Sequence, residues 1–230
     1  MALAPLVRAV PLALTLLACS GPPSPAQSTA TTTSTAGADS ARLVTTVRGF
    51  SGPEAVRYDP DQDVWFVANW NGRGGDRDNN GFISRVRPGG EVERMRWVAG
   101  GANGVTLHAP RGMTIVGDTL WACDVDAVRG FHRRTGAPVA SIPLTDFDVG
   151  FLNDLAPGPD GALYATDTGR NRVYRIAGRH VTVALADSAL GAPNGIAWDA
   201  EGDRFVIVPF GGGHTLHGWR PGATTLDSVG

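Results

Sequence analysis

The sequence has 230 residues, of which 42% are hydrophobic and 18% are charged, a composition typical of a globular protein. The formal net charge is −2, so the chain lacks a strong positive field that would recruit nucleic acid or an acidic membrane. Arginine supplies all 20 basic residues, and the lack of lysine excludes Schiff-base chemistry and a Walker-type phosphate loop.

The start of the chain has the architecture of a signal peptide. Arg8 precedes an apolar run over residues 9–18 that is too short to span a bilayer as a helix. The run ends in the sequence LLAC, which resembles a bacterial lipobox, in which cleavage precedes the cysteine and the thiol receives a diacylglycerol. We therefore expect a lipoprotein signal peptide over residues 1–18, lipidation at Cys19 and a lipid-anchored location in the bacterial cell envelope. An ordinary signal peptide, with Cys19 incidental, is the alternative.

Residues 19–41 continue as a stretch rich in Ser, Thr, Ala, Pro and Gly that contains no aromatic side chain. Such a segment cannot bury enough apolar surface to fold, so we expect a disordered tether between the lipidated cysteine and a folded domain over residues 42–230. Cys123 then has no partner. It ends an apolar run, where a buried and inert thiol is expected.

Four segments of the remaining chain repeat the same order of a polar anchor, a turn rich in Asp and Gly, and an apolar strand. The anchors are Glu54, Arg111, Asn153 and Asn194, which are 57, 42 and 41 residues apart. The apolar strands are expected over residues 64–69, 120–124, 163–167 and 205–208, with third strands such as 82–86 and 172–176. This spacing predicts an all-β chain, a β-propeller of four-stranded blades. A β-sandwich does not explain why the same order recurs four times.

Two insertions lengthen the first unit, one over residues 70–81 and one around residues 100–107. Within the first insertion, residues 76–81 partly match an EF-hand calcium loop, but Arg87 stands where that loop needs a bidentate glutamate. A solvated hairpin insertion and a second calcium site both remain open for this segment.

The repeats resemble two related kinds of propeller. Residues 161–173 look like an NHL repeat, and the set of anchors looks like the six-bladed regucalcin/gluconolactonase (LRE-like) family. That resemblance implies one divalent cation, usually Ca²⁺, at the end of the central tunnel. Its ligands here would be Glu54, Asn153 and Asn194, and the family's further aspartate, also proposed as general base, would come from a later blade. Phe151 departs from the family, because the sugar-lactone enzymes have an arginine there.

The resemblance to a six-bladed ring also predicts that the sequence is cut short at its C-terminus. Four units leave an open arc, and the last residues, 224–230, read as a strand in progress. Residues 42–48 read as a strand that would complete the final blade. An exposed sheet edge at each end would invite aggregation, which closure of the ring removes.

The anchors also make chemical sense as a ring. One carboxylate and two amide oxygens that converge on a point suit a hard cation such as Ca²⁺. Such a cation polarises a carbonyl and lowers the pKa of a bound water, two routes to ester hydrolysis. Arg111 would bind an anionic group of a ligand, or would pair with Glu54. Alternatively, the asparagines cap turns and Glu54 is a solvated rim residue.

Two functions therefore remain open. One is a Ca²⁺-dependent hydrolase of lactones or related esters. The other is a non-catalytic propeller that binds a small-molecule ligand or an envelope protein. The membrane would be contacted through the lipid anchor alone, and nucleic acid is not an expected partner.

Overall fold

A computed structural model describes residues 43–211 and 215–229 of the chain. The predicted signal peptide, the lipidation at Cys19 and the tether lie outside these residues. In the part of the chain that is described, no helix has the length and apolar character needed to cross a bilayer.

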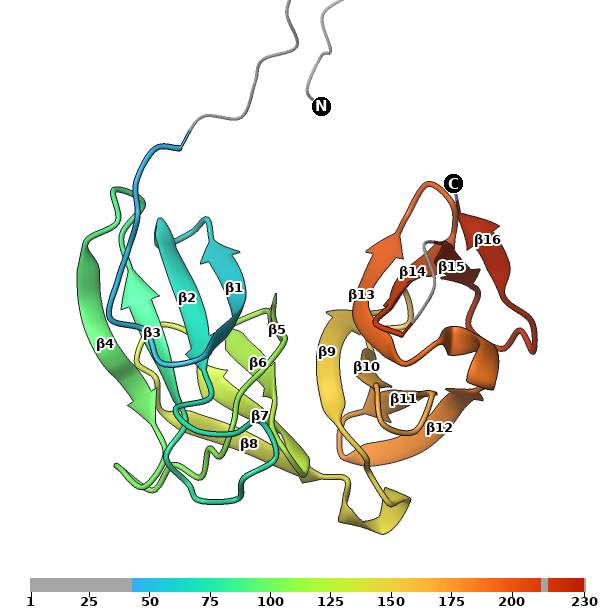
Figure 1. Ribbon diagram of the computed structural model, residues 1–230, viewed down its shortest axis with the longest axis horizontal. Coiled ribbons are helices and arrows are strands. Elements are labelled where there is room, and N and C mark those ends of the chain that lie inside the picture. Colours follow the sequence, from blue (N-terminus) through green and yellow to red (C-terminus); the bar gives the residue numbers. More distant parts are fainter. Residues whose placement is uncertain (1–42, 212–214, 230) are drawn as a thin grey trace, which may run out of the picture. The chain divides into compact units, whose positions relative to one another are not determined.

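The described residues form four antiparallel sheets, and in each sheet four strands follow one another in chain order (Figure 1). The first sheet contains β1 (Pro53–Asp59), β2 (Val64–Asn69), β3 (Phe82–Val86) and β4 (Val92–Ala99). The second contains β5 (Met113–Val116), β6 (Thr119–Cys123), β7 (Ala127–His132) and β8 (Pro138–Pro143). The third contains β9 (Leu152–Pro157), β10 (Leu163–Asp167), β11 (Arg172–Ala177) and β12 (His180–Ala186). The fourth contains β13 (Pro193–Asp199), β14 (Arg204–Pro209), β15 (Leu216–Trp219) and β16 (Asp227–Val229).

This arrangement confirms the predicted β-propeller of four-stranded blades. The strands predicted over residues 64–69, 82–86 and 163–167 match β2, β3 and β10 at both ends. Residues 43–48 adopt no regular structure and have no strand partner among the described residues. The strand predicted over residues 42–48 would complete a further blade, so it stays a prediction. A strand needs a neighbour to satisfy its backbone groups, and an apolar sequence pattern alone does not supply one.

The middle strands of the blades are the most buried, because they lie between other strands of their own blade and pack against an adjacent blade. All five residues of β10 are buried, whereas the outer strand β4 is half-buried or exposed at most positions. The predicted Asp- and Gly-rich turns form between strands, and two of them place Asp63 and Asp203 at φ of 50° and 48°. Aspartate tolerates this left-handed conformation better than most residues.

Three hydrophobic clusters join the blades in pairs. The first cluster unites the first and second blades, with Phe66 and Leu120 among its members. The second cluster unites the second and third blades. The third unites the third and fourth blades, where the rings of Tyr164 and Phe205 lie 4.6 Å apart. A repeat that cannot bury its faces alone is thus stabilised by its neighbours.

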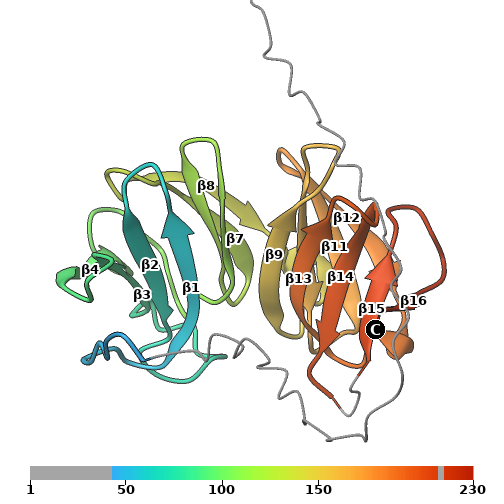
Figure 2. The ribbon, with the colours of Figure 1, turned by 90° about the horizontal axis from the view of Figure 1, so that it is seen from above.

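The first strand of each blade lies beside the first strand of the next, so that β1, β5, β9 and β13 follow one another, and Figure 2 shows β9 directly beside β13. The backbone N–H of Gly112 donates to the Asn153 carbonyl at 2.9 Å, which ties β9 to the residue just before β5. A Cβ atom on Gly112 would lie 2.5 Å from Asp154 Cα. Close approach of these strands therefore requires glycine after the anchor Arg111, and it brings the anchors to the same end of the blades.

The two insertions of the first blade bind each other. The side-chain oxygen of Asn79 accepts from the Leu107 N–H at 2.8 Å, and the Asn79 N–H donates to His108 Nδ1 at 3.0 Å. The Gly81 N–H donates to the Leu107 carbonyl. Residues 70–81 are therefore held against the second insertion, beside the anchor region.

Candidate metal and ligand pocket

A pocket of about 380 Å³ lies where β1, β9 and β13 begin. Its polar lining consists of the side chains of Glu54, Asn153, Thr168 and Asn194. Its aromatic lining consists of Trp70, Phe151 and Phe210. A second pocket of about 190 Å³ shares the same glutamate and both asparagines. The structure thus brings together the three oxygen donors predicted as metal ligands.

Hydrogen bonds leave the donor oxygens of these three residues available. Asn153 is 4% exposed, and its Nδ2 donates to Thr168 Oγ1 at 3.0 Å, which assigns the Nδ2 to the protein and leaves Oδ1 for a ligand. Thr168 Oγ1 in turn donates to the Pro193 carbonyl at 2.7 Å. Within the described residues, no protein group donates to the Glu54 carboxylate or bonds to the Asn194 side chain.

The electrostatics of the pocket favour a positive charge. Desolvation by the surrounding protein, and secondly the nearby Asp154 carboxylate, raise the pKa of Glu54 to about 7, although Arg111 acts in the opposite direction. The Glu54 side chain itself stays accessible from the pocket, so a ligand can reach it. Desolvation also raises the pKa of Asp154, against hydrogen bonds from the N–H groups of Ile196 and Leu155. A bound cation would offset the cost of keeping these carboxylates charged.

Arg111 lies behind the pocket and is 1% exposed. Its Nη1 donates to the Leu152 carbonyl at 2.8 Å, its Nη2 donates to the Gly74 carbonyl, and its guanidinium lies 3.7 Å from the centre of the Phe151 ring. Among the described residues it forms no ion pair, so the predicted alternative of a pair with Glu54 is not observed. A ligand in this pocket meets Phe151 before the guanidinium. Anion binding by Arg111 stays a prediction that would require the side chain to be uncovered.

A second set of polar residues positions the anchors, and the sequence analysis missed it. In three of the four blades, a side-chain oxygen at or just after the end of the second strand accepts from a backbone N–H group that precedes the anchor. Asn69 binds Ser51 at 3.0 Å, Asp124 binds Ala109 at 2.9 Å, and Asp167 binds Phe151 at 2.7 Å. Recurrence of Asn or Asp at this point of three units was the signal that could have revealed the set.

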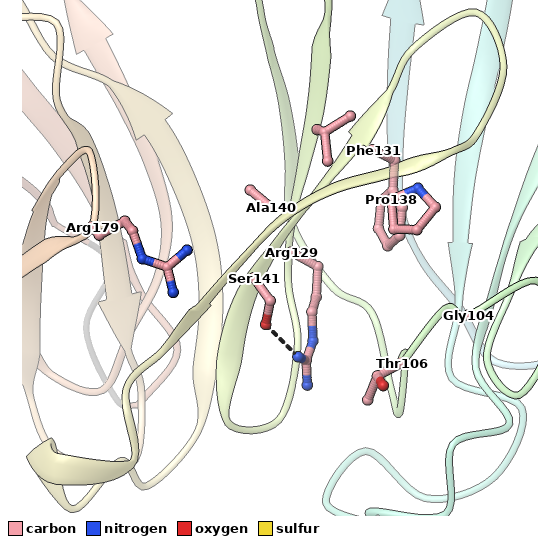
Figure 3. A pocket seen from close by; sticks show the side chains of 9 residues that line it. Gly104, Thr106, Arg129, Phe131, Pro138, Ala140, Ser141 and Arg179 are labelled. Carbon is pink, nitrogen blue, oxygen red and sulfur yellow. Dashed lines mark hydrogen bonds between the residues drawn. The ribbon is translucent and has the colours of Figure 1, made fainter.

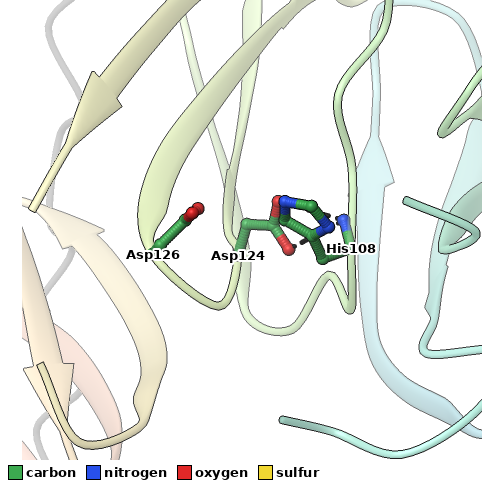
Figure 4. A group of neighbouring side chains, drawn as sticks. All are labelled: His108, Asp124 and Asp126. Carbon is green, nitrogen blue, oxygen red and sulfur yellow. Dashed lines mark hydrogen bonds between the residues drawn. The ribbon is translucent and has the colours of Figure 1, made fainter. Parts of the chain in front are cut away.

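Another group of possible ligand atoms, in His108, Asp124 and Asp126, lies within 4.8 Å (Figure 4). The Asp124 carboxylate already accepts from two backbone N–H groups and from Arg129 Nε at 3.1 Å. Arg129 Nη2 also pairs with Asp126 at 2.9 Å, and His108 Nδ1 accepts from Asn79. The Asp124 carboxylate and the His108 Nδ1 lone pair are therefore used within the protein, and this group holds the loop before Arg111.

A pocket of about 400 Å³ beside β7 and β8 contains two arginines (Figure 3). Arg129 is committed to two aspartates and to Ser141 Oγ at 2.6 Å, and Arg179 is exposed. In the first insertion, Asp78 accepts from both the N–H and the Nδ2 of Asn80, so its carboxylate is engaged locally. The second calcium site in that loop stays a prediction.

Comparison with known proteins supports the fold. No protein-family model and no curated protein matches the sequence. Among solved structures, virginiamycin B lyase from Staphylococcus aureus matches 77% of this chain and 55% of its own, with a TM-score of 0.57 and 15% identity. The periplasmic gluconolactonase of Pseudomonas aeruginosa matches 80% of this chain and 58% of its own, with a TM-score of 0.55 and 20% identity. A putative gluconolactonase matches 79% of this chain and 64% of its own, with a TM-score of 0.55 and 16% identity.

These likenesses, at identities of 20% or less, show a β-propeller fold. The chain spans between 55% and 64% of the length of these three structures. The NHL-like character of residues 161–173, which lie in the third blade, stays a prediction.

Proposed function

We propose that the protein is a metal-dependent hydrolase of lactones or related esters, with a divalent cation such as Ca²⁺ held by Glu54, Asn153 and Asn194. The observation that carries this proposal is the convergence of three repeat-equivalent oxygen donors on one pocket. Their oxygens are not used by the surrounding described residues, which distinguishes them from the aspartates that hold the loops. The fold likeness to two gluconolactonases agrees with this reading.

The donor set fits a hard cation. Ca²⁺ takes about 6–8 oxygen ligands and accepts amide carbonyls beside carboxylates. Three protein donors leave positions for water and substrate, and for the further aspartate that the family resemblance implies. The raised pKa of Glu54, to about 7, marks a carboxyl group that lacks compensating charge in the protein.

Each of the pocket residues has a distinct role in the proposed reaction. When bound, the cation supplies polarisation of the substrate carbonyl and acidification of a water. Glu54 contributes the formal negative charge that attracts it. Thr168 holds the Asn153 amide so that its oxygen faces the ligand, and Trp70 and Phe151 exclude water from one wall of the pocket.

The proposal is tested by following hydrolysis of a panel of γ- and δ-lactones by the full chain in Ca²⁺ and in a chelator. We expect hydrolysis that requires the metal and is lost in Glu54→Gln. Hydrolysis that is unaffected by chelation would contradict the metal assignment. Tight Ca²⁺ binding without turnover of any lactone or ester would instead favour the non-catalytic, ligand-binding propeller.

A further inference from the structure

The aromatic wall of the pocket, formed by Trp70, Phe151 and Phe210, indicates which class of substrate the pocket accepts. We infer that the pocket takes a lactone or ester with an apolar alkyl or aryl substituent, and not a polyhydroxylated sugar lactone. This inference rests on the proposed function for the chemistry. Its basis in the structure is the aromatic lining by Phe151, Phe210 and Trp70, together with the small number of polar side chains in the pocket.

Phe210 presents apolar surface to a ligand. It lines the pocket with 75% of its surface exposed, more than any large apolar side chain of β5–β15. Isolated apolar side chains on a surface are ordinary, but this one borders a concave site that also holds two other aromatic rings. A substituent that covers it would remove both surfaces from water, which is the main source of affinity in such pockets.

Phe151 is held rigidly in place. The Arg111 guanidinium lies 3.7 Å from its ring centre and Trp70 approaches edge to face, with centroids 6.3 Å apart. The loop around Phe151 is fixed by its own N–H, which donates to Asp167 Oδ1 at 2.7 Å. Arg111 is anchored by main-chain carbonyls, so it supports the ring from behind. An apolar wall that cannot rearrange is a specificity element.

The pocket has too few polar side chains to bind the hydroxyl groups of a sugar ring. A bound sugar lactone needs a partner for each of several hydroxyls, because a buried hydroxyl without a hydrogen bond is costly. Of the four polar side chains in the pocket, Thr168 donates its hydroxyl to Pro193 and receives the Asn153 amide. The indole N–H of Trp70 is buried and has no hydrogen-bond partner among the described residues. The remaining polar side chains, those of Glu54, Asn153 and Asn194, are the ones assigned to the cation.

The test compares two δ-lactones of the same ring size on the full chain, δ-decalactone and D-glucono-δ-lactone. We expect kcat/KM to favour δ-decalactone by at least about tenfold, the discrimination that a few methylenes provide in an apolar pocket. Phe210→Ala should lower kcat/KM for δ-decalactone by about tenfold and so reduce its preference over the sugar lactone. Because Phe210 is largely exposed, this variant is expected to fold.

Trp65→Ala is the matched control. Trp65 is an aromatic residue of β2 that is 38% exposed, contacts the Tyr58 ring with centroids 4.6 Å apart, and does not line the pocket. It should leave the preference for δ-decalactone unchanged. Equal or better turnover of the sugar lactone by the wild type would overturn the inference, and so would a loss of preference in Trp65→Ala equal to that in Phe210→Ala.

A binding experiment separates this inference from the proposed function. The lactams that correspond to the two lactones resist hydrolysis, and their binding is measured by calorimetry. Suppose that the protein hydrolyses no lactone but binds the alkyl lactam, and that Phe210→Ala weakens this binding about tenfold. This result would refute the proposed hydrolase function and support the apolar specificity of the pocket. Metal-dependent hydrolysis, together with tighter binding of the sugar lactam than of the alkyl lactam, would support the hydrolase function and refute the apolar specificity. Failure of the alkyl lactam to bind would also overturn the inference.

Discussion

At the scale of single residues, Glu54 differs from the carboxylates that hold the fold together. Asp124 and Asp167 accept backbone N–H groups, and Asp148 and Asp227 pair with arginines on the surface. Glu54 has neither kind of partner among the described residues, and its pKa is raised to about 7. Its chemistry therefore depends on what enters the pocket.

Ca²⁺ affinity should rise with pH through about 7, because the Glu54 proton must leave before the cation binds. Glu54→Gln should weaken binding about tenfold or more and flatten this pH dependence, since it removes the formal charge among the three donors. Calorimetry at several pH values measures both effects. Equal affinity of the wild type and the variant would refute the metal assignment.

The raised pKa of Glu54 also affects the stability of the metal-free protein. The folded-state pKa of about 7 lies above the ordinary value of 4.5, so the folded chain holds this proton more tightly than the unfolded chain. The contribution of Glu54 to stability is therefore fully present below pH 4.5 and is lost as the pH rises through about 7. Glu54→Gln should be less sensitive to pH in that window, as denaturant unfolding would show. An unchanged pH profile would mean that Glu54 titrates normally.

Arg111 should be important for folding, because it is a buried cation that main-chain carbonyls satisfy. Replacing it with Met leaves the Leu152 and Gly74 carbonyls without their donor, and we expect a loss of about 2–4 kcal/mol in the free energy of unfolding. Arg179→Met, at an exposed position, is the control and should stay within about 0.5 kcal/mol. If Arg111→Met is as stable as the control, the role in supporting Phe151 is wrong.

Cys123 illustrates a residue whose prediction is confirmed. It is fully buried between the second and third blades, and desolvation raises its pKa well above the ordinary value despite the nearby Arg111. A thiol that stays protonated is a poor nucleophile. The apolar run that precedes Cys123 in the sequence already indicated this environment.

At the scale of elements, the close approach of first strands determines which residues follow the anchors. Gly112 faces Asp154 so closely that a methyl group would displace the neighbouring strand. Gly195 follows Asn194 in the same way, although its surroundings are more open. Small residues at these points let the blades converge, and convergence creates the pocket.

Gly112→Ala should therefore destabilise the fold by about 1–3 kcal/mol through overpacking. It should also displace Asn153, whose carbonyl accepts from the Gly112 N–H, and so weaken Ca²⁺ binding. Gly75→Ala is a suitable control, because a Cβ atom there meets no atom within 4 Å. Thermal denaturation and metal titration of both variants measure the effects. A Gly112→Ala protein indistinguishable from Gly75→Ala would show that the strands can separate without cost.

At the scale of the whole molecule, the blades are connected by hydrophobic clusters and by single polar links. Arg57 Nε donates to the Met113 carbonyl at 2.6 Å between the first and second blades, and Thr166 Oγ1 donates to the Asn194 carbonyl between the third and fourth. These links lie next to the pocket. The geometry of the site therefore depends on packing between blades and not on any one blade.

Cys19→Ala should abolish fatty-acid labelling and release the protein from the membrane fraction, because the lipid-modified thiol is the predicted anchor. Metabolic labelling with palmitate, followed by fractionation, checks this outcome. Ser20→Ala, at the neighbouring position, is the control and should stay membrane-bound. Persistence of Cys19→Ala in the membrane fraction would leave an ordinary signal peptide as the better interpretation.

The sequence by itself determined the blade architecture, because the repeat sets the order of anchor, turn and strand, and local turn chemistry sets the ends of strands such as β2 and β10. It also selected the three oxygen donors, since equivalent positions in a repeat occupy equivalent places around one axis. The tertiary structure alone decided which donors stay free. Hydrogen bonds within the second and third blades engage Asp124 and Asp167 and leave Glu54 and Asn194 available. The partners are about 15 residues apart in the sequence, and the spacing of single residues does not identify them. The aromatic wall was decided in the same way, because Trp70, Phe151 and Phe210 come from different blades and meet through packing.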